Sequence, residues 1–241
     1  MVNIITMVSV SGVLFGTTAM VIVLSVFNGF DNIIHSLYQR VDADFKIELK
    51  TGKLFDVDND FISGINNING VILCSEILEQ KLLAQYLDYQ YVVEAKGVDE
   101  NYIQVSNLNQ NIVLGNYLDG TKNFVIVGNK VFNRLALRLL DFENSLKLSF
   151  FKEAKMMDIN SSMQTQSFYA TGVFRTDVEI DETHLVLSIH DLRNFLKISR
   201  QCSSIEVKTD NKVNPRDIHA GLISFLGPDY VIKNRIEQRP F

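Results

Sequence analysis

The feature that most constrains this chain is an N-terminal stretch without any charged side chain. Between Met1 and Phe30 there is no Asp, Glu, Lys or Arg, and the first charged residue is Asp31. At about 1.5 Å of rise per residue, a helix over residues 4–26 would be about 34 Å long, enough to cross a hydrocarbon core of about 30 Å. The sequence therefore predicts a transmembrane helix here.

Three other interpretations of this stretch fit less well. A signal peptide would have a basic n-region, and this N-terminus has no Lys or Arg. A buried core helix is seldom uncharged over such a length, and a lipoprotein signal would need a cysteine directly after the apolar run, whereas the first cysteine is Cys74. Apolar residues at helical spacing continue through residues 30–37, which predicts that the membrane helix extends as a stalk.

Small and hydroxyl-bearing residues lie along the expected membrane helix. Gly12 and Gly16 form a GxxxG pair, and Ser9 and Thr17 extend the small surface. Small residues at this spacing let a second membrane helix approach closely, although GxxxG also occurs by chance in such helices. We interpret these four positions as candidate residues for packing against another membrane helix.

The rest of the chain has the composition of a folded domain, and its charge excludes some classes of function. Hydrophobic residues make up 46% of the chain and the net charge is −5, which argues against a protein that follows a nucleic-acid backbone. Two cysteines, Cys74 and Cys202, and four histidines are too few for a disulfide framework or a zinc module. The two cysteines could still meet in the fold. We expect no nucleic acid, metal or cofactor.

Residues after 42 predict an α+β domain, because alternating and helical apolar patterns both occur. The outer strands are expected over residues 45–49, 71–83, 89–98, 203–208 and 230–233. One helix begins at Asp58 or Asp60; another has Asn214 as its N-cap, Pro215 in its first turn and Gly227 at its end. We expect the two ends of this region to pair into one split β-α-β sheet, with the middle of the chain inserted.

The middle of the chain predicts a mainly-β segment. Its strands are expected over residues 112–114, 124–127, 146–151, 168–174 and 185–188, and its short helices over 130–140 and 190–198. A polar loop, Lys152–Ser167, carries Met156, Met157 and Met163. Exposed methionine suits an adaptable binding surface, so these three are candidate partner-binding residues. A flexible loop with incidental methionines explains them equally well.

Motifs for catalysis are not found in the sequence. It has no GxxxxGK[ST] phosphate-binding loop, no GxGxxG, no GxSxG and no HExxH. The aspartates of residues 56–60 resemble the start of a calcium loop, but Phe61 stands where glycine is needed, so an acidic helix N-terminus explains them better. His184 and His190 have no obvious acidic partner. We expect a binding or mechanical protein, not an enzyme.

A series of segments, in order along the chain, resembles one family of membrane proteins. The strongest is SVFNGF, which contains Asn28, Gly29 and Phe30; FYATGVF follows later, with Gly172 and Phe174. Looser segments are DADFKIEL, VIVGNKVFNRLALRL, IEVKTDN and YVIKNRIEQ. Together they resemble the lipoprotein-releasing ABC transporter permeases of the LolC/LolE type, within the MacB/FtsX-like permease superfamily.

The resemblance implies a domain organisation. Residues 1–41 would be a transmembrane helix and stalk, residues 42–98 and 201–241 the two parts of a Porter-like subdomain, and residues 99–200 an inserted, mainly-β Sabre-like subdomain. The domain after the helix would lie in the periplasm, with the helix in the cell inner membrane. Since such permeases have three further membrane helices, and no hydrophobic span follows Phe241, we expect this sequence to be a fragment of a longer permease.

The resemblance also implies function and partners. The chain would belong to a permease that extracts lipoproteins, its cargo, from the inner membrane and passes them to a periplasmic lipoprotein carrier. It would need an ABC ATPase subunit and a second permease subunit, as a homo- or heterodimer. The Lys152–Ser167 loop lies where LolC-type subunits engage the carrier, but lacks the expected proline- and glycine-bearing pattern. The alternatives are a MacB-like efflux or mechanotransmission permease and a single-pass, membrane-tethered binding or sensor module.

Overall fold

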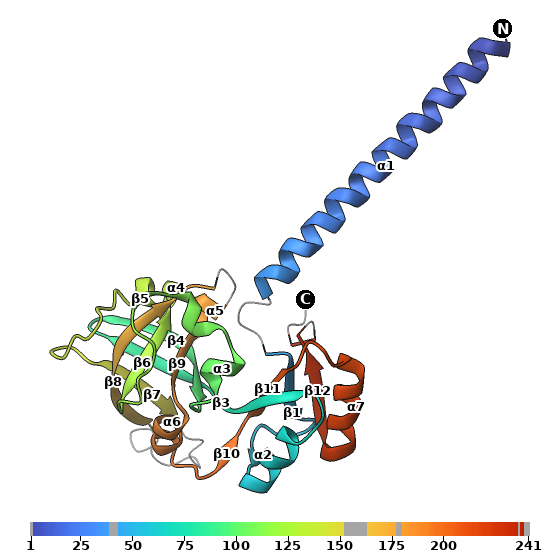
Figure 1. Ribbon diagram of the computed structural model, residues 1–241. Coiled ribbons are helices and arrows are strands. Elements are labelled where there is room, and N and C mark those ends of the chain that lie inside the picture. Colours follow the sequence, from blue (N-terminus) through green and yellow to red (C-terminus); the bar gives the residue numbers. More distant parts are fainter. Residues whose placement is uncertain (1, 39–42, 152–162, 177–179, 236, 239–241) are drawn as a thin grey trace. The chain divides into compact units, whose positions relative to one another are not determined.

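The chain divides into two units, which are described separately (Figure 1). The structure is a computed structural model that describes residues 2–38, 43–151, 163–176, 180–235 and 237–238. The first unit, residues 1–39, is formed by the helix α1 (Val2–Tyr38). The second, residues 40–241, contains all of the β-strands in the described part of the chain.

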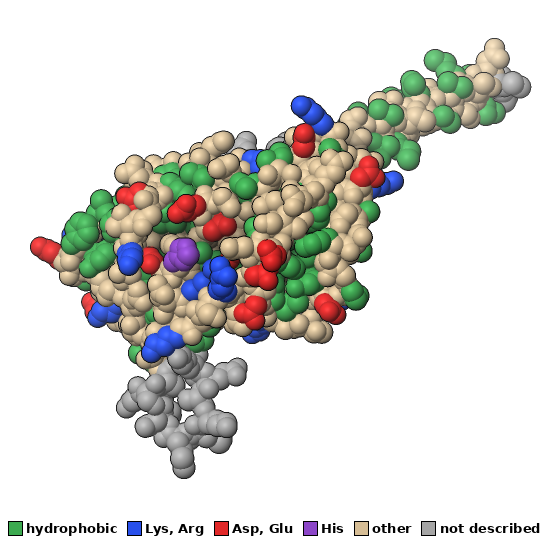
Figure 2. All heavy atoms as spheres, turned by 60° about the horizontal axis from the view of Figure 1, so that its bottom comes forward, with side chains coloured by type: hydrophobic (Ala, Val, Ile, Leu, Met, Phe, Trp, Pro, Cys, Tyr) green, Lys and Arg blue, Asp and Glu red, His purple; other side chains and the backbone are tan. Residues whose placement is uncertain are grey.

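Helix α1 is continuous through both the predicted membrane span and the predicted stalk. Its segment Asn3–Phe30 is the one helix, among the described residues, that is long and apolar enough to cross a membrane. Hydrophobic side chains along this segment are exposed, and the space-filling view shows those on one face (Figure 2). A helix that is apolar on every side suits a hydrocarbon environment. The prediction of one unbroken apolar helix is confirmed.

One part of the second unit is an antiparallel sheet with two helices. Its strands have the order β12–β1–β11–β3, so strands from both ends of the domain's sequence lie side by side. Helix α2 (Asn59–Asn66) joins β1 to β3, and helix α7 (Pro215–Leu226) joins β11 to β12. The strand bounds are β1 (Phe45–Leu49), β3 (Val71–Tyr86), β11 (Ser204–Thr209) and β12 (Tyr230–Asn234).

Both helices begin where their capping residues predict. The Asp58 carboxylate accepts a hydrogen bond of 2.7 Å from the Phe61 N–H at the start of α2. The Asn214 side chain accepts one of 3.0 Å from the Arg216 N–H at the start of α7. Each cap satisfies a backbone donor that the first helical turn leaves free. The predicted starts at Asp58 and Asn214 are confirmed.

Between this sheet and its helices lies an apolar core, the sheet core. It contains Phe45, Ile47, Phe55, Val57, Ile65, Cys74, Cys202, Ile205, Val207, Ile218, Leu222 and Leu226. Phe45 and Ile47 alternate with Lys46 and Glu48, so one face of β1 turns toward the helices and the other away. Both cysteines are free and buried, and burial raises the pKa of the Cys74 thiol to about 12.

The other part of the second unit is a closed ring of strands. Strands β3, β4, β9, β6, β8 and β7 each pair with the next, and β7 pairs back with β3. The β4–β9 and β6–β8 pairs are parallel and the others antiparallel. The bounds are β4 (Tyr89–Val98), β6 (Phe124–Gly128), β7 (Leu146–Phe151), β8 (Met163–Phe174) and β9 (His184–Ser188). We call this part the barrel.

The barrel has its own apolar core and is lined by short elements. Its core includes Leu78, Leu82, Val93, Val127, Leu148, Phe168, Leu185 and Phe195. Strand β5 (Ile112–Gly115) adds to β8. The remaining elements are β2 (Phe55–Asp56), α3 (Tyr102–Val105), η1 (Leu108–Asn111), α4 (Asn129–Arg134), α5 (Ile180–Thr183), α6 (Ile189–Leu196) and β10 (Gln201–Cys202).

Two predictions about the middle of the chain are wrong in extent. The helix expected over residues 130–140 ends at Arg134, because Ala136 takes a left-handed backbone conformation (φ 50°). Leu135 and Leu137 are buried all the same, so their spacing reflects packing of an irregular segment.

The predicted loop Lys152–Ser167 is also partly strand. Residues 163–167 begin β8 and pair with β7, from Met163 opposite Phe151 to Ser167 opposite Lys147. The polar residues of this stretch led us to expect a loop, but they occupy a two-stranded extension with little apolar burial. Residues 152–162 lie outside the described residues.

Gly172 is required by the close approach of two backbones. A Cβ atom added at Gly172, in β8, would lie 2.3 Å from the carbonyl oxygen of Asn116. Because backbone cannot yield as a side chain can, we expect Gly172→Ala to lower the free energy of unfolding by about 2 kcal/mol. Urea unfolding of the full chain in detergent, followed by near-UV circular dichroism, measures this.

The matched control for this variant is Gly221→Ala. A Cβ there would lie 2.9 Å from the Cγ2 methyl of Ile68, a contact with a side chain instead of a backbone. We expect a change of less than about 1 kcal/mol, since alanine also favours the α7 helix. An equal loss in both variants would contradict the packing argument for Gly172.

Candidate functional site

The residues predicted to pack against a second membrane helix lie on the exposed surface of α1. Ser9, Gly12, Gly16 and Thr17 are all exposed, and a Cβ added at either glycine would meet nothing within 4 Å. The Thr17 hydroxyl donates to the Val13 carbonyl at 2.9 Å, within its own helix. The glycines thus offer an open, shallow surface, while Thr17 is already hydrogen-bonded.

The other predicted residues fall into two groups. Asn28, Gly29 and Phe30 continue the exposed surface of α1, whereas Phe174 is fully buried beside Ile77 in an apolar cluster of the barrel. Gly172 lies in β8 at the backbone contact described above. The structure therefore gives Gly172 and Phe174 packing roles.

The predicted methionines do not form a described surface together. Met156 and Met157 lie outside the described residues. Met163 begins β8 and is 49% exposed. Whether the three methionines bind a partner stays a prediction.

The most unusual chemistry lies on the face of the sheet that turns away from α2 and α7. Lys46 stands opposite Glu206 on β11 and opposite Lys233 on β12. Although this face is polar, the Glu206 side chain is only 5% exposed and that of Lys46 15%. Helix α3 lies against β3 and β11, so charged side chains are enclosed between the sheet and the barrel.

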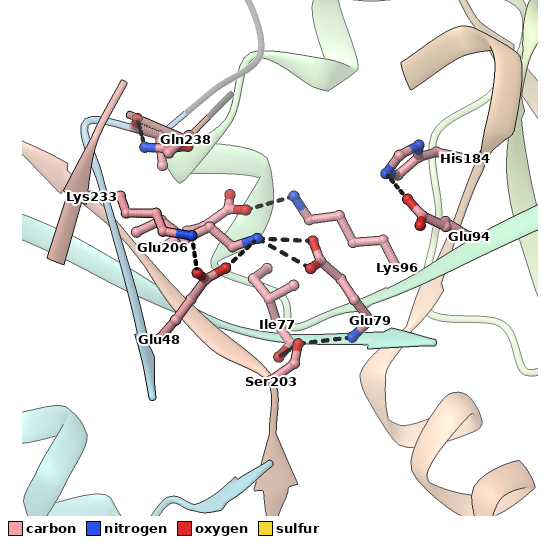
Figure 3. Close-up of polar contacts among 12 residues, drawn as sticks. Glu48, Ile77, Glu79, Glu94, Lys96, His184, Ser203, Glu206, Lys233 and Gln238 are labelled. Carbon is pink, nitrogen blue, oxygen red and sulfur yellow. Dashed lines mark hydrogen bonds and ion pairs between the residues drawn. The ribbon is translucent and has the colours of Figure 1, made fainter. Parts of the chain in front are cut away.

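These charges form two neighbouring groups of ion pairs, Lys96–Glu206 and Glu79–Lys46–Glu48–Lys233, which we together call the junction cluster (Figure 3). It consists of Lys46, Glu48, Glu79, Lys96, Glu206 and Lys233. The Lys96 ammonium lies 2.6 Å from a Glu206 oxygen, and the Lys46 ammonium lies 3.1 Å from Glu79 and 3.0 Å from Glu48. The second Glu48 oxygen is 2.5 Å from Lys233. Three lysines thus face three glutamates, and the cluster carries no net charge.

The pKa values within the cluster reflect this pairing. Burial alone would lower the pKa of Lys96, but the Glu206 carboxylate raises it well above its usual value. Burial would raise the pKa of Glu79, and the ammonium groups of Lys46 and Lys96 lower it instead. Lys96 and Glu79 are therefore held in their charged forms at neutral pH.

One oxygen of the cluster is left over. Lys96 also lies over the Tyr102 ring, 4.8 Å from its centroid, so its ammonium is surrounded. The second carboxylate oxygen of Glu206 is buried and has no hydrogen-bond partner among the described residues. A partly satisfied buried network stabilises a fold less than apolar packing would.

His184 has an acidic partner that the sequence does not reveal. This partner is Glu94. Glu94 on β4 lies opposite His184 on the parallel strand β9, and Nε2 of His184 lies 3.3 Å from the Glu94 carboxylate. The expectation that His184 lacks an acidic partner is therefore wrong. Burial and the nearby Lys96 charge lower the pKa of His184, despite Glu94.

The junction cluster is not evident from the sequence, because the alternation in β1 is typical of a strand with one core face and one solvent face. Lys46 and Glu48 do lie on the second face, but the inserted barrel covers it. The one available signal was opposite charge at alternating positions in two strands, residues 46–48 and 206–208. In the part of the chain that the structure describes, no group of three or more His, Cys, Asp or Glu side chains could hold a metal ion.

Breaking the Lys96–Glu206 pair should cost far more than replacing it. We expect Lys96→Met to lower the free energy of unfolding by about 3 kcal/mol, because Glu206 is left buried and unpaired. The double variant Lys96→Met/Glu206→Leu should return to within about 1 kcal/mol of the unsubstituted chain, or exceed it. Urea unfolding of the full chain in detergent measures both.

An exposed ion pair provides the control for this comparison. Lys130 pairs with Glu182, and both side chains are more than one third exposed (54% and 38%). We expect Lys130→Met to change the free energy of unfolding by less than about 1 kcal/mol. If Lys96→Met costs no more than Lys130→Met, the Lys96–Glu206 pair is not a buried pair in solution.

Comparison with known proteins finds curated relatives in sequence and solved structures of similar fold. No protein-family model matches the chain. The lipoprotein-releasing system transmembrane protein LolC of Buchnera aphidicola subsp. Acyrthosiphon pisum (strain APS) is 25% identical over 200 residues, covering 82% of this chain and 48% of that protein. LolC of Buchnera aphidicola subsp. Schizaphis graminum (strain Sg) is 23% identical over 214 residues, with the same coverage. The chain spans about half the length of these relatives.

Two solved structures have a fold similar to that of this chain. The periplasmic region of MacB from Actinobacillus actinomycetemcomitans matches with a TM-score of 0.55 at 15% identity, over 82% of this chain and 92% of that one. The extracellular domain of the noncanonic ABC-type transporter YknZ from Gram-positive bacteria matches with a TM-score of 0.52 at 14% identity, over 79% and 99%. The chain is thus similar in sequence to LolC, and its second unit, which follows one apolar N-terminal helix, is similar in fold to the MacB and YknZ domains.

Proposed function

We propose that this chain is part of a membrane permease subunit of an ABC transporter that extracts lipoproteins from the inner membrane and passes them to a periplasmic carrier. The observation that carries the proposal is the similarity to LolC over 200 residues, which spans 82% of the chain. The apolar helix α1 is what a membrane permease needs at that position. The domain after it would lie in the periplasm.

We also propose the two-part division of this domain that the family resemblance implies. The sheet with α2 and α7 would be the Porter-like part, and the barrel the inserted Sabre-like part. Their separate apolar cores support the division. We place the first boundary on β3 near Ile77 instead of at residue 98, since Leu78 and Leu82 already belong to the barrel core.

The partners of this permease follow from the same proposal. An ABC ATPase subunit would hydrolyse ATP and move the membrane helices, and a second permease subunit would complete the membrane pathway. The exposed surface around Gly12 and Gly16 would contact another membrane helix. The segment around Met163 would face the lipoprotein carrier, because it is the exposed end of a long hairpin. No cofactor is proposed for this chain.

A MacB-like efflux or mechanotransmission permease is the second candidate. The match to the MacB periplasmic region, with a TM-score of 0.55, favours it. The two candidates share the ATPase, the membrane helices and a moving periplasmic domain, and they differ in cargo.

The first experiment purifies the native, tagged protein in mild detergent and identifies its subunits by mass spectrometry. We expect a bound ATPase and a permease chain much heavier than 27.4 kDa, because relatives are about twice as long. The complex is then placed in proteoliposomes with an acylated lipoprotein, ATP and a soluble periplasmic carrier. Release of the lipoprotein should require both ATP and the carrier.

The outcomes of this experiment separate the candidates. A complex with an ATPase that hydrolyses ATP but releases no lipoprotein would favour the MacB-like alternative. A chain of 27.4 kDa without an ATPase would contradict both permease candidates and favour a membrane-tethered binding module.

A leucine on the small-residue surface of α1 should weaken the complex. We expect Gly16→Leu to reduce retention of the partner membrane subunit by roughly tenfold, which corresponds to about 1–2 kcal/mol of helix packing. Quantitative mass spectrometry of the purified complex measures it. Thr18→Leu, at an exposed position on the opposite side of α1 from Gly16, is the matched control and should retain the partner. Full retention in Gly16→Leu would contradict this role of the glycine.

A further inference from the structure

The sheet and the barrel do not share an apolar core. The sheet core and the barrel core have no residue in common. A third cluster, around Ile77, Tyr102 and Phe174, belongs to the barrel side except for Ile77. Apolar burial therefore stabilises each part internally and contributes little across the boundary between them.

The chain crosses this boundary at two neighbouring points. One is in β3 at Ile77. The other is the segment from α6 to Ser203, which contains β10 and already contacts the sheet side through the β10–β2 pair. Ser203 bonds to Ile77 twice, with its N–H at 2.8 Å and its hydroxyl at 3.1 Å from the Ile77 carbonyl oxygen, and its hydroxyl accepts from the Glu79 N–H at 2.9 Å (Figure 3). These hydrogen bonds hold the two connecting segments together at the contact between Ile77 and Ser203.

Away from this spot, charged groups connect the two parts. Lys96 on β4 of the barrel pairs with Glu206 on the sheet, and Lys46 on the sheet pairs with Glu79 on β3 beyond Ile77. On α6, Arg193 lies 2.7 Å from Glu76. The strength of these ion pairs depends on the distance between their charged groups. A small rotation of the barrel about the Ile77–Ser203 contact would lengthen these distances together.

From this geometry we propose that the Ile77–Ser203 crossing is a hinge between sheet and barrel, and that the Lys96–Glu206 and Lys46–Glu79 pairs lock it in the arrangement described. When the pairs separate, the barrel rotates as one body about the crossing while both apolar cores stay intact. This goes beyond the proposed function and does not depend on the cargo.

The chemistry of the boundary supports a lock that can open. Apolar contact across it would favour a single permanent arrangement, whereas a domain boundary rich in polar groups is typical of parts that move. Opening would also hydrate the Glu206 oxygen that has no partner among the described residues, so separating the pair is partly compensated. The lock therefore holds one state without making it the only accessible one.

The test measures a distance across the hinge in the full chain. Spin labels are placed at Asn133→Cys on α4 of the barrel and Ser224→Cys on α7 of the sheet, both exposed and both on helices. The native Cys74 and Cys202 are buried, and both are replaced by alanine to prevent labelling. Pulsed electron paramagnetic resonance then gives the distribution of label–label distances in detergent.

We expect one narrow distance in this background and a second distance after Lys96→Met. The population of the second distance should rise by about tenfold or more, because the variant leaves Glu206 uncompensated only in the closed arrangement. The double variant Lys96→Met/Glu206→Leu should restore the single narrow distance. Lys130→Met, which removes an ion pair within the barrel, should leave the distribution unchanged.

A milder variant keeps the test decisive if Lys96→Met does not fold. Glu79→Gln removes the charge of a side chain that is 34% exposed, so a folded chain is expected. It should raise the second distance as well, by a smaller factor. A single unchanged distance in folded Glu79→Gln and in folded Lys96→Met would overturn the hinge. A broad distribution in the unsubstituted background would overturn the lock.

Discussion

Everything in the second unit depends on the length and register of one strand, β3. Its sixteen residues pair with β11 in the first half and with β4 and β7 in the second half. It contributes Cys74 to the sheet core and Leu82 to the barrel core. Because side chains alternate between faces, a slip of one residue would turn both sets of apolar side chains outward at once. Two separate cores therefore fix the register of a single strand.

The junction cluster follows from the same constraint. Where β3 passes from the sheet to the barrel it is buried on both faces, with Ser75 and Ile77 as enclosed as Cys74 and Leu78. The sheet face beside it is consequently shielded from water, although it carries the charged positions of an ordinary half-exposed strand. The pairing of Glu206 with Lys96, and of Lys46 with Glu79 and Glu48, makes this burial tolerable, because each charge meets its opposite.

The sequence predicted local structure better than it predicted contacts. The bounds of β4 and the cap of α7 at Asn214 were recovered because they depend on neighbouring residues. The pairing of β4 with β9 was not, since Glu94 and His184 become neighbours only when the barrel closes. The helix expected up to residue 140 failed for a similar reason: Leu137 has helical spacing, but the barrel core buries it on an irregular segment. The candidate site could not be predicted from one sequence. A lysine on an alternating strand is expected to be exposed to solvent, unless the segment that packs over that face of the sheet is known.

The ends of the described domain show where a displacement would enter it. Gln238 donates to the Ala43 carbonyl at 3.1 Å, and Arg235 pairs with Asp44 at 2.7 Å, so the first and last described residues of the domain are joined beside β1 and β12. A movement delivered at residue 43 or residue 238 therefore acts on the same edge of the sheet. Among the described residues, it reaches the barrel through β11, β3, the β2–β10 pair and the ion pairs of the junction cluster. If the chain works as a permease, the junction cluster determines how much of that movement is transmitted to the barrel. When the ion pairs are intact, the sheet and the barrel move together; when the pairs are broken, the sheet moves without the barrel.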